Sequence, residues 1–272
     1  MIDTLPARQR GTQRPALDKS QSQRPQALEP LESRLCLSAA AANVYAQGST
    51  VDGHSLGEWA QAWSKYVYET PAPTNPLHDA TGALAAANQP KGVFFLAGSD
   101  STAKVDRTVT VKPGTKLFIP VLTNIWITLP TDEPITIGQI REFLDQQMDT
   151  TTGAFLTIDG KAVSDVASHR EVDPNPSGFT TNLPADNIFG VPAGSYPKSA
   201  TDGIFVMAQP LTPGQHTIHF GGTIPAAGNF TLDVTYHVNV VPPGKADPPA
   251  PPAFSTKPNK SDGKDDKDCW DD

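Results

Sequence analysis

Three histidines in the last third of the chain are the first candidates for chemistry, because imidazole binds transition metals and transfers protons near neutral pH. His216 and His219 lie three positions apart in a predicted strand, so their side chains point to opposite faces and do not share a metal directly. His237, on a neighbouring strand, could join either one, as in a cupin-like metal site. No His-x-His pair and no suitably spaced carboxylate accompanies them. We therefore predict surface or lightly buried histidines, no metal and no cofactor.

Carboxylates offer a second kind of chemistry, because glycoside hydrolysis needs only two acids whose separation is set by the fold. Asp132, Glu133, Glu142 and Asp145 lie on or near a predicted helix and are most simply solvated helix acids. Asp79 lies in a long polar loop, and it is the candidate residue of an alternative hypothesis, a secreted hydrolase with loop carboxylates. The glycine motifs that bind phosphates and dinucleotides are absent. The catalytic residues, if any, stay unknown.

The aromatic residues divide into one ligand candidate and one structural group. Trp126 lies a few residues after a predicted strand, where an exposed indole would suit stacking on a sugar ring. Trp59, Trp63 and Tyr66 follow one another at i, i+4 and i+7, which places them on one face of a helix. A stripe at helical spacing is typical of a buried face, so we predict a structural role for these three.

Two helices are predicted from their capping boxes, in which the side chains of the first and fourth residues satisfy each other's backbone amides. The first begins at Ser55 with Glu58 three positions on, and it runs to about Tyr68 before prolines end it. The second begins at Thr136 with Gln139 three positions on. Its apolar residues recur at helical spacing for about a dozen residues.

The remaining apolar segments predict strands, which are 93–97, 105–111, 116–121, 155–158, 203–209, 216–221 and 229–241. Pro-Gly pairs at 113–114 and 213–214 each join two strands, and we interpret them as similar corners of a sandwich. The predicted fold is mainly β, a single jelly-roll-like β-sandwich over 44–241 with two accessory helices. A parallel α/β fold is the alternative, but only two convincing helices are present.

Composition limits the rest of the chain. The 272 residues include 27 prolines and 21 glycines, and the net charge is −8 without any cluster of Lys or Arg, so nucleic acid is not an expected partner. No apolar run approaches the roughly 20 residues of a membrane span. Residues 1–38 and the Pro-rich, then Lys/Asp-rich tail 242–272 are predicted to be disordered. Cys36 and Cys269 lie in these ends and are predicted to be unpaired.

Residues 28–40, which read LEPLESRLCLSAA, resemble the LEPR-XLL motif found near the N-terminus of many large exported bacterial proteins. Cys36 stands where that motif usually has leucine. The resemblance implies export to the cell envelope or the exterior, with residues 1–38 as an export or sorting segment.

Four further segments, 58–63, 75–82, 92–98 and 111–121, resemble in this order a group of uncharacterised secreted bacterial proteins. Either Phe94 or Phe95 stands where that group has a tryptophan, and the cysteines common there are missing. To our knowledge the group has no assigned activity, so the resemblance implies a shared fold and export. The leading hypothesis is a non-catalytic cell-surface or extracellular module whose expected partner is a glycan or the matrix.

Overall fold

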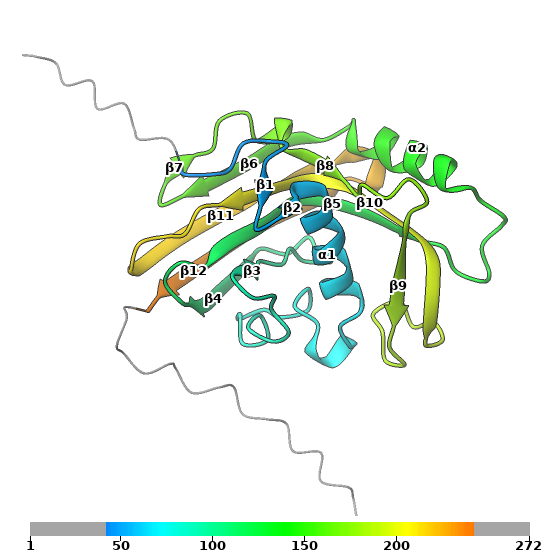
Figure 1. The fold of residues 1–272 in the computed structure, drawn as a ribbon, viewed down its shortest axis with the longest axis horizontal. Coiled ribbons are helices and arrows are strands. Elements are labelled where there is room, and N and C mark those ends of the chain that lie inside the picture. Colours follow the sequence, from blue (N-terminus) through cyan, green and yellow to red (C-terminus); the bar gives the residue numbers. More distant parts are fainter. Residues whose placement is uncertain (1–41, 242–272) are drawn as a thin grey trace, which may run out of the picture. The chain divides into compact units, whose positions relative to one another are not determined.

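The computed structural model describes residues 42–241, which form a mainly β domain with two α-helices, as predicted (Figure 1). The predictions for residues 1–38, for the motif at 28–40, for the tail 242–272 and for the two cysteines lie outside the described residues.

Two five-stranded sheets make up the domain, together with a small ribbon formed by β1 and β2. The first sheet has the order β3-β5-β10-β8, and β9 also pairs with β10. The second sheet has the order β4-β12-β11-β6-β7. The pairs β3/β5 and β4/β12 are parallel, and the others are antiparallel. The bounds of the strands are β1 Thr50–Val51, β2 His54–Ser55, β3 Val93–Phe95, β4 Val105–Val111, β5 Lys116–Ile127, β6 Thr152–Ile158, β7 Lys161–Ala162, β8 Arg170–Val172, β9 Phe179–Leu183, β10 Gly194–Ala208, β11 Gly214–Ile224 and β12 Phe230–Val240.

The main core lies between the two sheets, as in a sandwich. Alternate residues of β12 face it, namely Leu232, Val234, Tyr236, Val238 and Val240, and all are buried as the alternation in the sequence predicts. Both Pro-Gly turns carry the chain from one sheet to the other, from β4 to β5 and from β10 to β11. The prediction that they form similar sandwich corners is confirmed.

Helix α1 (Leu56–Tyr68) covers the outer face of the first sheet (Figure 1). Its predicted capping box is present, with Ser55 as the N-cap and Glu58 returning the bond. Trp63 is 2% exposed and packs edge-on against Phe205 of β10. The helix lies so close to β8 that a Cβ at Gly57 would be 2.5 Å from the carbonyl oxygen of Val172. Only glycine therefore allows this approach.

Helix α2 (Ile137–Met148) also has its predicted capping box, formed by Thr136 and Gln139. It packs Ile140 and Leu144 on Ala200 of β10, close to Trp126 of β5. Helix α2 therefore covers the first sheet at the end of β5 and the beginning of β10. Short 3-10 helices complete the elements at Ala72–Thr74, Val166–Ser168 and Pro225–Ala227.

The prediction from the sequence was wrong about the length of several strands, most of all β5 and β10. β5 was expected to end at residue 121 but continues to Ile127, and β10 was expected to begin at 203 but begins at Gly194. The short strands β8 and β9, which pair with β10, were not predicted. These segments carry Asn, Thr, Ser, Pro and Lys and lack strict alternation, so pairing with neighbours decides their conformation rather than local propensity.

Candidate functional site

A buried arginine organises one side of the sandwich. Arg107 of β4 points into the core where valines occupy the neighbouring inward positions, and it is 1% exposed. Its guanidinium donates to the carbonyl oxygens of Asp79 at 2.5 Å, Ala97 at 2.6 Å and Gly98 at 2.8 Å, and more weakly to that of Leu77 at 3.4 Å. Within residues 42–241 the partners of this cation are therefore dipoles rather than a carboxylate.

Tyr236 of β12 completes this cluster. Its ring lies under the guanidinium of Arg107, 5.5 Å from ring centre to Cζ, and its hydroxyl accepts a hydrogen bond from Nη1 at 2.8 Å. The same hydroxyl accepts from the N–H of Ala97 and donates to its carbonyl, both at 3.0 Å. Burial raises the pKa of Tyr236, which keeps the hydroxyl protonated as this donor. We call Arg107 and Tyr236 the arginine clamp.

The arginine clamp determines the path of the chain after β3. Leu96 makes the last ladder contact with β5, donating to the carbonyl of Phe118 at 2.9 Å. The indole N–H of Trp63 then donates to the carbonyl of Leu96 at 2.7 Å. The next two residues, Ala97 and Gly98, bond to the clamp instead of to β5. The chain therefore leaves the edge of β5 at this point.

A groove of about 400 Å³ opens where the chain departs. We call it the β5 groove. The middle of β5, the end of α1, the segment 98–100 and the turn between β11 and β12 line it. Most of its walls are apolar, including Ile125, Phe230 and Leu232. At its mouth Tyr68 and Phe189 are stacked, with centroids 5.5 Å apart, and Phe189 is 41% exposed.

Asp79 does not lie in the β5 groove, and its carboxylate is occupied. One oxygen accepts from the backbone N–H groups of Thr81 and Gly82, both at 2.9 Å, and the other from that of Leu84 at 2.8 Å. The residue is 5% exposed. Burial alone would raise the pKa of Asp79, but these backbone donors together lower it. Both oxygens therefore hold the loop beside Arg107 in place.

Trp126 lies within β5 rather than after a strand, which corrects the predicted strand end. It packs edge-on against Phe143 of α2, with centroids 5.2 Å apart. Its indole N–H is buried and has no hydrogen-bond partner among the described residues. Trp59, at 8% exposed, and Trp63 are buried under α1, and the hydroxyl of Tyr66 donates to the carbonyl of Ala85 at 3.3 Å. The β5 groove therefore includes Trp63 but not Trp126.

The segment Gly53–Gly57 has the Gly-x-Ser-x-Gly spacing of a hydrolase nucleophile turn, a match that the capping-box interpretation overlooked. Ser55 does lie between a short strand, which it ends, and a helix. Its φ of −65° and ψ of 159° are those of ordinary extended backbone. Its hydroxyl accepts a hydrogen bond from the backbone N–H of Glu58 at 3.2 Å and donates one to the carboxylate of Glu58 at 3.0 Å. These contacts make Ser55 a helix cap, and the described residues place no histidine on its hydroxyl.

Each candidate histidine has an aspartate partner. His216 contacts Asp159 at 2.7 Å, His219 contacts Asp233 at 2.9 Å and His237 contacts Asp106 at 3.0 Å. These partners are distant in sequence, so the strand pairing that brings them together was not readable from spacing. Within residues 42–241, no group of three or more His, Cys, Asp or Glu side chains is arranged to hold a metal.

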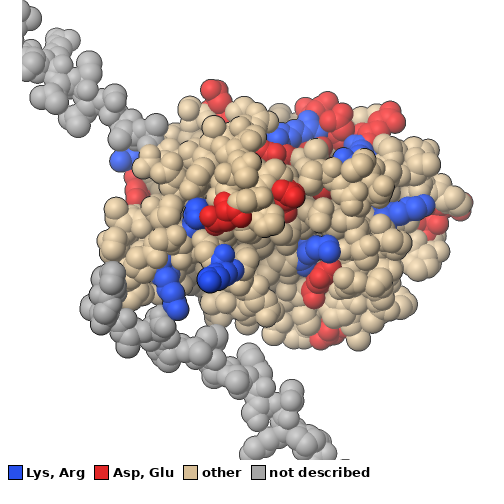
Figure 2. All heavy atoms as spheres, viewed as in Figure 1, with Lys and Arg blue, Asp and Glu red and all other residues tan. Residues whose placement is uncertain are grey.

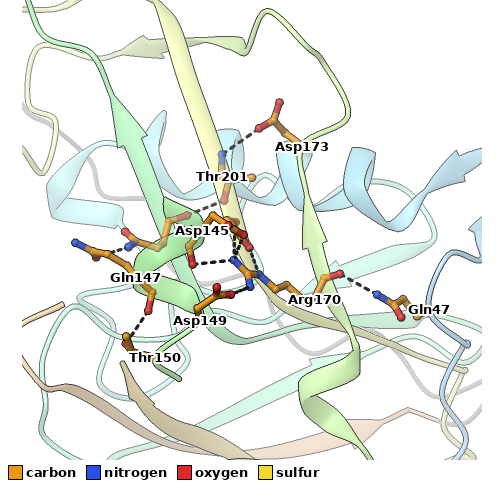
Figure 3. Close-up of polar contacts among 10 residues, drawn as sticks. Gln47, Asp145, Gln147, Asp149, Thr150, Arg170, Asp173 and Thr201 are labelled. Atoms are coloured by element: carbon orange, nitrogen blue, oxygen red, sulfur yellow. Dashed lines mark hydrogen bonds and ion pairs between the residues drawn. The ribbon is translucent and has the colours of Figure 1, made fainter. Parts of the chain in front are cut away.

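A second arginine forms a more exposed cluster between α2 and the first sheet (Figure 3). Arg170 of β8 binds Asp202 of β10 at 2.7 Å, Asp145 of α2 at 2.9 Å and Asp149, the C-cap residue of α2, at 2.5 Å. The hydrogen bonds that Arg170 donates to Asp202 raise the pKa of Arg170 further above its already high value. The carboxylates of Asp145 and Asp149 are 65% and 63% exposed. We call this group the Arg170 cluster, and it ties the end of α2 to the sheet.

The face of the molecule shown in Figure 2 carries no basic patch among the described residues. Lysines and arginines are scattered there, and acidic side chains gather near the top, over β8 and α2. No helix among residues 42–241 is long and apolar enough to cross a membrane.

Comparison with known proteins adds no family. No protein-family model matches the chain. No curated protein matches it either. A similar chain among solved structures comes from "Structure of PbICP-C in complex with falcipain-2", with 13% identity over 54% of this chain and 98% of that one, and a TM-score of 0.20. A similarity at this TM-score carries no argument about fold or function.

Proposed function

We propose that this protein is a non-catalytic binding module of the cell envelope or exterior, and that the β5 groove is its ligand site. The observation that carries the proposal is the groove itself. Binding sites for small ligands are concave, mostly apolar and furnished with a few polar groups. The β5 groove combines apolar walls with Ser99, Asp100 and Asn124 at about 400 Å³, which lies within the usual range for such sites.

The contacts of the candidate catalytic residues support a module without turnover. Asp79 holds a loop through backbone bonds, and Ser55 caps a helix. Neither side chain lines the β5 groove. The alternative of a secreted hydrolase therefore loses its candidate Asp79 at this site, and the carboxylate that does line the groove, Asp100, bonds His78 at 2.7 Å. Export itself is inferred from the resemblance of residues 28–40, and cell fractionation that found the full chain in the cytoplasm would contradict it.

The expected ligand is more apolar than the glycan suggested by the sequence. Trp126, the predicted stacking residue, packs beneath α2 with a buried indole N–H. The walls of the β5 groove are instead aliphatic and aromatic side chains, which suit an apolar ligand. A glycan array tests the hypothesis that Trp126 binds a glycan, because glycan binding that is lost in Trp126→Ala would support it.

The test uses an apolar fluorescent dye, N-phenylnaphthylamine, titrated into the full-length protein. Ala227 lines the groove in the turn between β11 and β12, so Ala227→Trp should fill it and weaken dye binding by at least about tenfold. The matched control is Ala226→Trp, because Ala226 is the exposed neighbour in the same turn and does not line the groove. Equal binding by both variants, at unchanged melting temperatures, would overturn the proposed site.

A further inference from the structure

The β5 groove exposes one edge of a β-strand. β3 pairs with β5 only from Lys116 to Phe118, whereas β10 pairs with β5 as far as Ile127 on the opposite edge. From residue 119 onward, β5 therefore has a ladder partner on one side only among the described residues. Pro120 stands where β3 ends, and a proline is tolerated at an edge because no N–H is needed there.

The orientation of the backbone groups along this edge follows from hydrogen bonds on the other one. The N–H of Thr128 donates to the carbonyl of Lys198 in the neighbouring strand segment, so residue 128 faces β10. Thr201 bonds Asp173 on the far side of β10 through both its N–H and its carbonyl. Its even-numbered neighbours in β10 therefore face β5. Because peptide groups alternate between the two edges of a strand, Leu122 and Asn124 also face β10.

Thr123 and Ile125 consequently direct their N–H and C=O groups away from β10, toward the free edge. A bulge determines which residues face the free edge. Ile204 pairs with Leu122 but Phe205 pairs with Pro120, so Val121 is an extra residue without a partner in β10. Before the bulge the even-numbered Phe118 faces β3, and after it the odd-numbered residues face the same edge. Thr123 and Ile125 both line the β5 groove.

We propose that the β5 groove takes an extended peptide, which adds to the first sheet as a strand beside β5. This inference rests on the proposed function and specifies its ligand. Two donor–acceptor pairs two residues apart, about 7 Å along a strand, match the repeat of another extended backbone. A hydrocarbon ligand would leave these groups unpaired, whereas an added strand satisfies them and places its alternate side chains in apolar pockets.

The charge of the groove specifies the peptide further. Among residues 42–241, Asp100 is the one carboxylate that lines the groove, and no Lys, Arg or His of this range lines it. The side chain of Asp100 is 47% exposed. Its partner His78, at 2.7 Å, lies at the rim and is 39% exposed. An acidic group beside apolar walls complements a cation. The expected ligand therefore has apolar residues at every second position and a Lys or Arg at one end.

The test screens an array of octapeptides of this pattern against the full-length protein, and it then measures hydrogen exchange with the best binder. The amides of Thr123 and Ile125 should become at least about tenfold more protected, while those of Leu122 and Asn124, already bonded to β10, should not change. Methylating the peptide nitrogens that face β5 should abolish binding. Asp100→Asn should weaken binding of the peptide about threefold to tenfold.

The outcomes separate this inference from the proposed function. Dye binding that Ala227→Trp blocks, together with no peptide binder in the array, overturns strand addition and leaves the groove as a site for small apolar ligands. A peptide that binds without protecting Thr123 and Ile125, or that binds equally well when methylated, also overturns it. Absence of both dye and peptide binding overturns the proposed function as well.

Discussion

The arginine clamp and the Arg170 cluster handle the same side chain in opposite ways. Arg107 is buried and is satisfied by carbonyl oxygens and a tyrosine hydroxyl. Arg170 is partly exposed and neutralised by three aspartates. Carbonyl acceptors belong to the backbone, so the first arrangement fixes the path of the chain. Carboxylates belong to side chains, so the second holds two finished elements together. Arg107 therefore determines the shape of a site, whereas Arg170 holds a helix on the sheet.

The largest expected effect is at Arg107. Arg107→Met leaves the buried carbonyls of Asp79 and Gly98 without a donor and that of Ala97 with the Tyr236 hydroxyl alone, and it should lower the free energy of unfolding by about 3–5 kcal/mol. Urea denaturation measures the change. Arg107→Lys is the control, because it keeps the charge but lacks the planar fork that spans these acceptors, and it should fall in between. A methionine variant as stable as the native protein would contradict the claim that the arginine clamp stabilises this part of the fold.

Trp63 holds the same stretch of chain from the opposite side, so Trp63→Ala should approach the effect at Arg107. The loss of a large buried aromatic should cost about 3–5 kcal/mol. Trp63→Phe keeps the packing but loses the bond to the Leu96 carbonyl, and it should cost about 1 kcal/mol. Thermal melts compare the two variants. An unchanged midpoint for the alanine variant would mean that this face of α1 does not anchor the helix.

Asp79 sharpens the comparison through pH. Its pKa is lowered in the folded state, so its contribution is present above the unfolded pKa of about 4 and is lost as pH falls through the folded value. Asp79→Asn should therefore cost about 2 kcal/mol at neutral pH. The difference from the native protein should shrink below about pH 4. Urea midpoints measured across this range give the test, and a difference independent of pH would contradict it.

The smallest effect is expected in the Arg170 cluster. Two of the partners of Arg170 are mostly exposed, and exposed ion pairs contribute little. Asp149→Asn removes one of them and keeps the two bonds from Arg170 to the buried Asp202, so it should cost only about 0.5 kcal/mol. Salt screens such pairs. The stability difference from the native protein should therefore narrow in about molar sodium chloride, whereas that of the Arg107 variant should not. A cost equal to that at Arg107 would show that the two arginines do the same work.

Much of the fold was predictable from the sequence because local chemistry determined it. Both capping boxes, the stripe of Trp59 and Trp63, the alternation of β12 and the two Pro-Gly corners are read within about a dozen residues. The site was not predictable in this way. Arg107 in a strand of valines is the one local signal, since an inward charge interrupts an apolar face. Its acceptors lie 9 to 30 positions away and Tyr236 lies 129 away, so pairing of distant strands creates the cluster.

The groove was hidden for a related reason. It depends on where β3 stops pairing with β5, and that point is fixed by bonds from β4 and β12 rather than by any residue of β3. The prediction for Trp126 assumed that a strand end is exposed, but α2 packs over this residue. The prediction for Asp79 assumed that a polar loop is exposed, but the backbone amides of that loop surround its carboxylate.

Hydrogen exchange of the free protein, followed residue by residue by NMR, tests most directly the claim that the arginine clamp leaves an open edge on β5. Thr123 and Ile125 should exchange at least about a hundredfold faster than Leu122 and Asn124, because only the latter pair is bonded to β10. Equal and strong protection of all four amides would mean that another segment already covers this edge, and it would contradict both the open groove and the added strand.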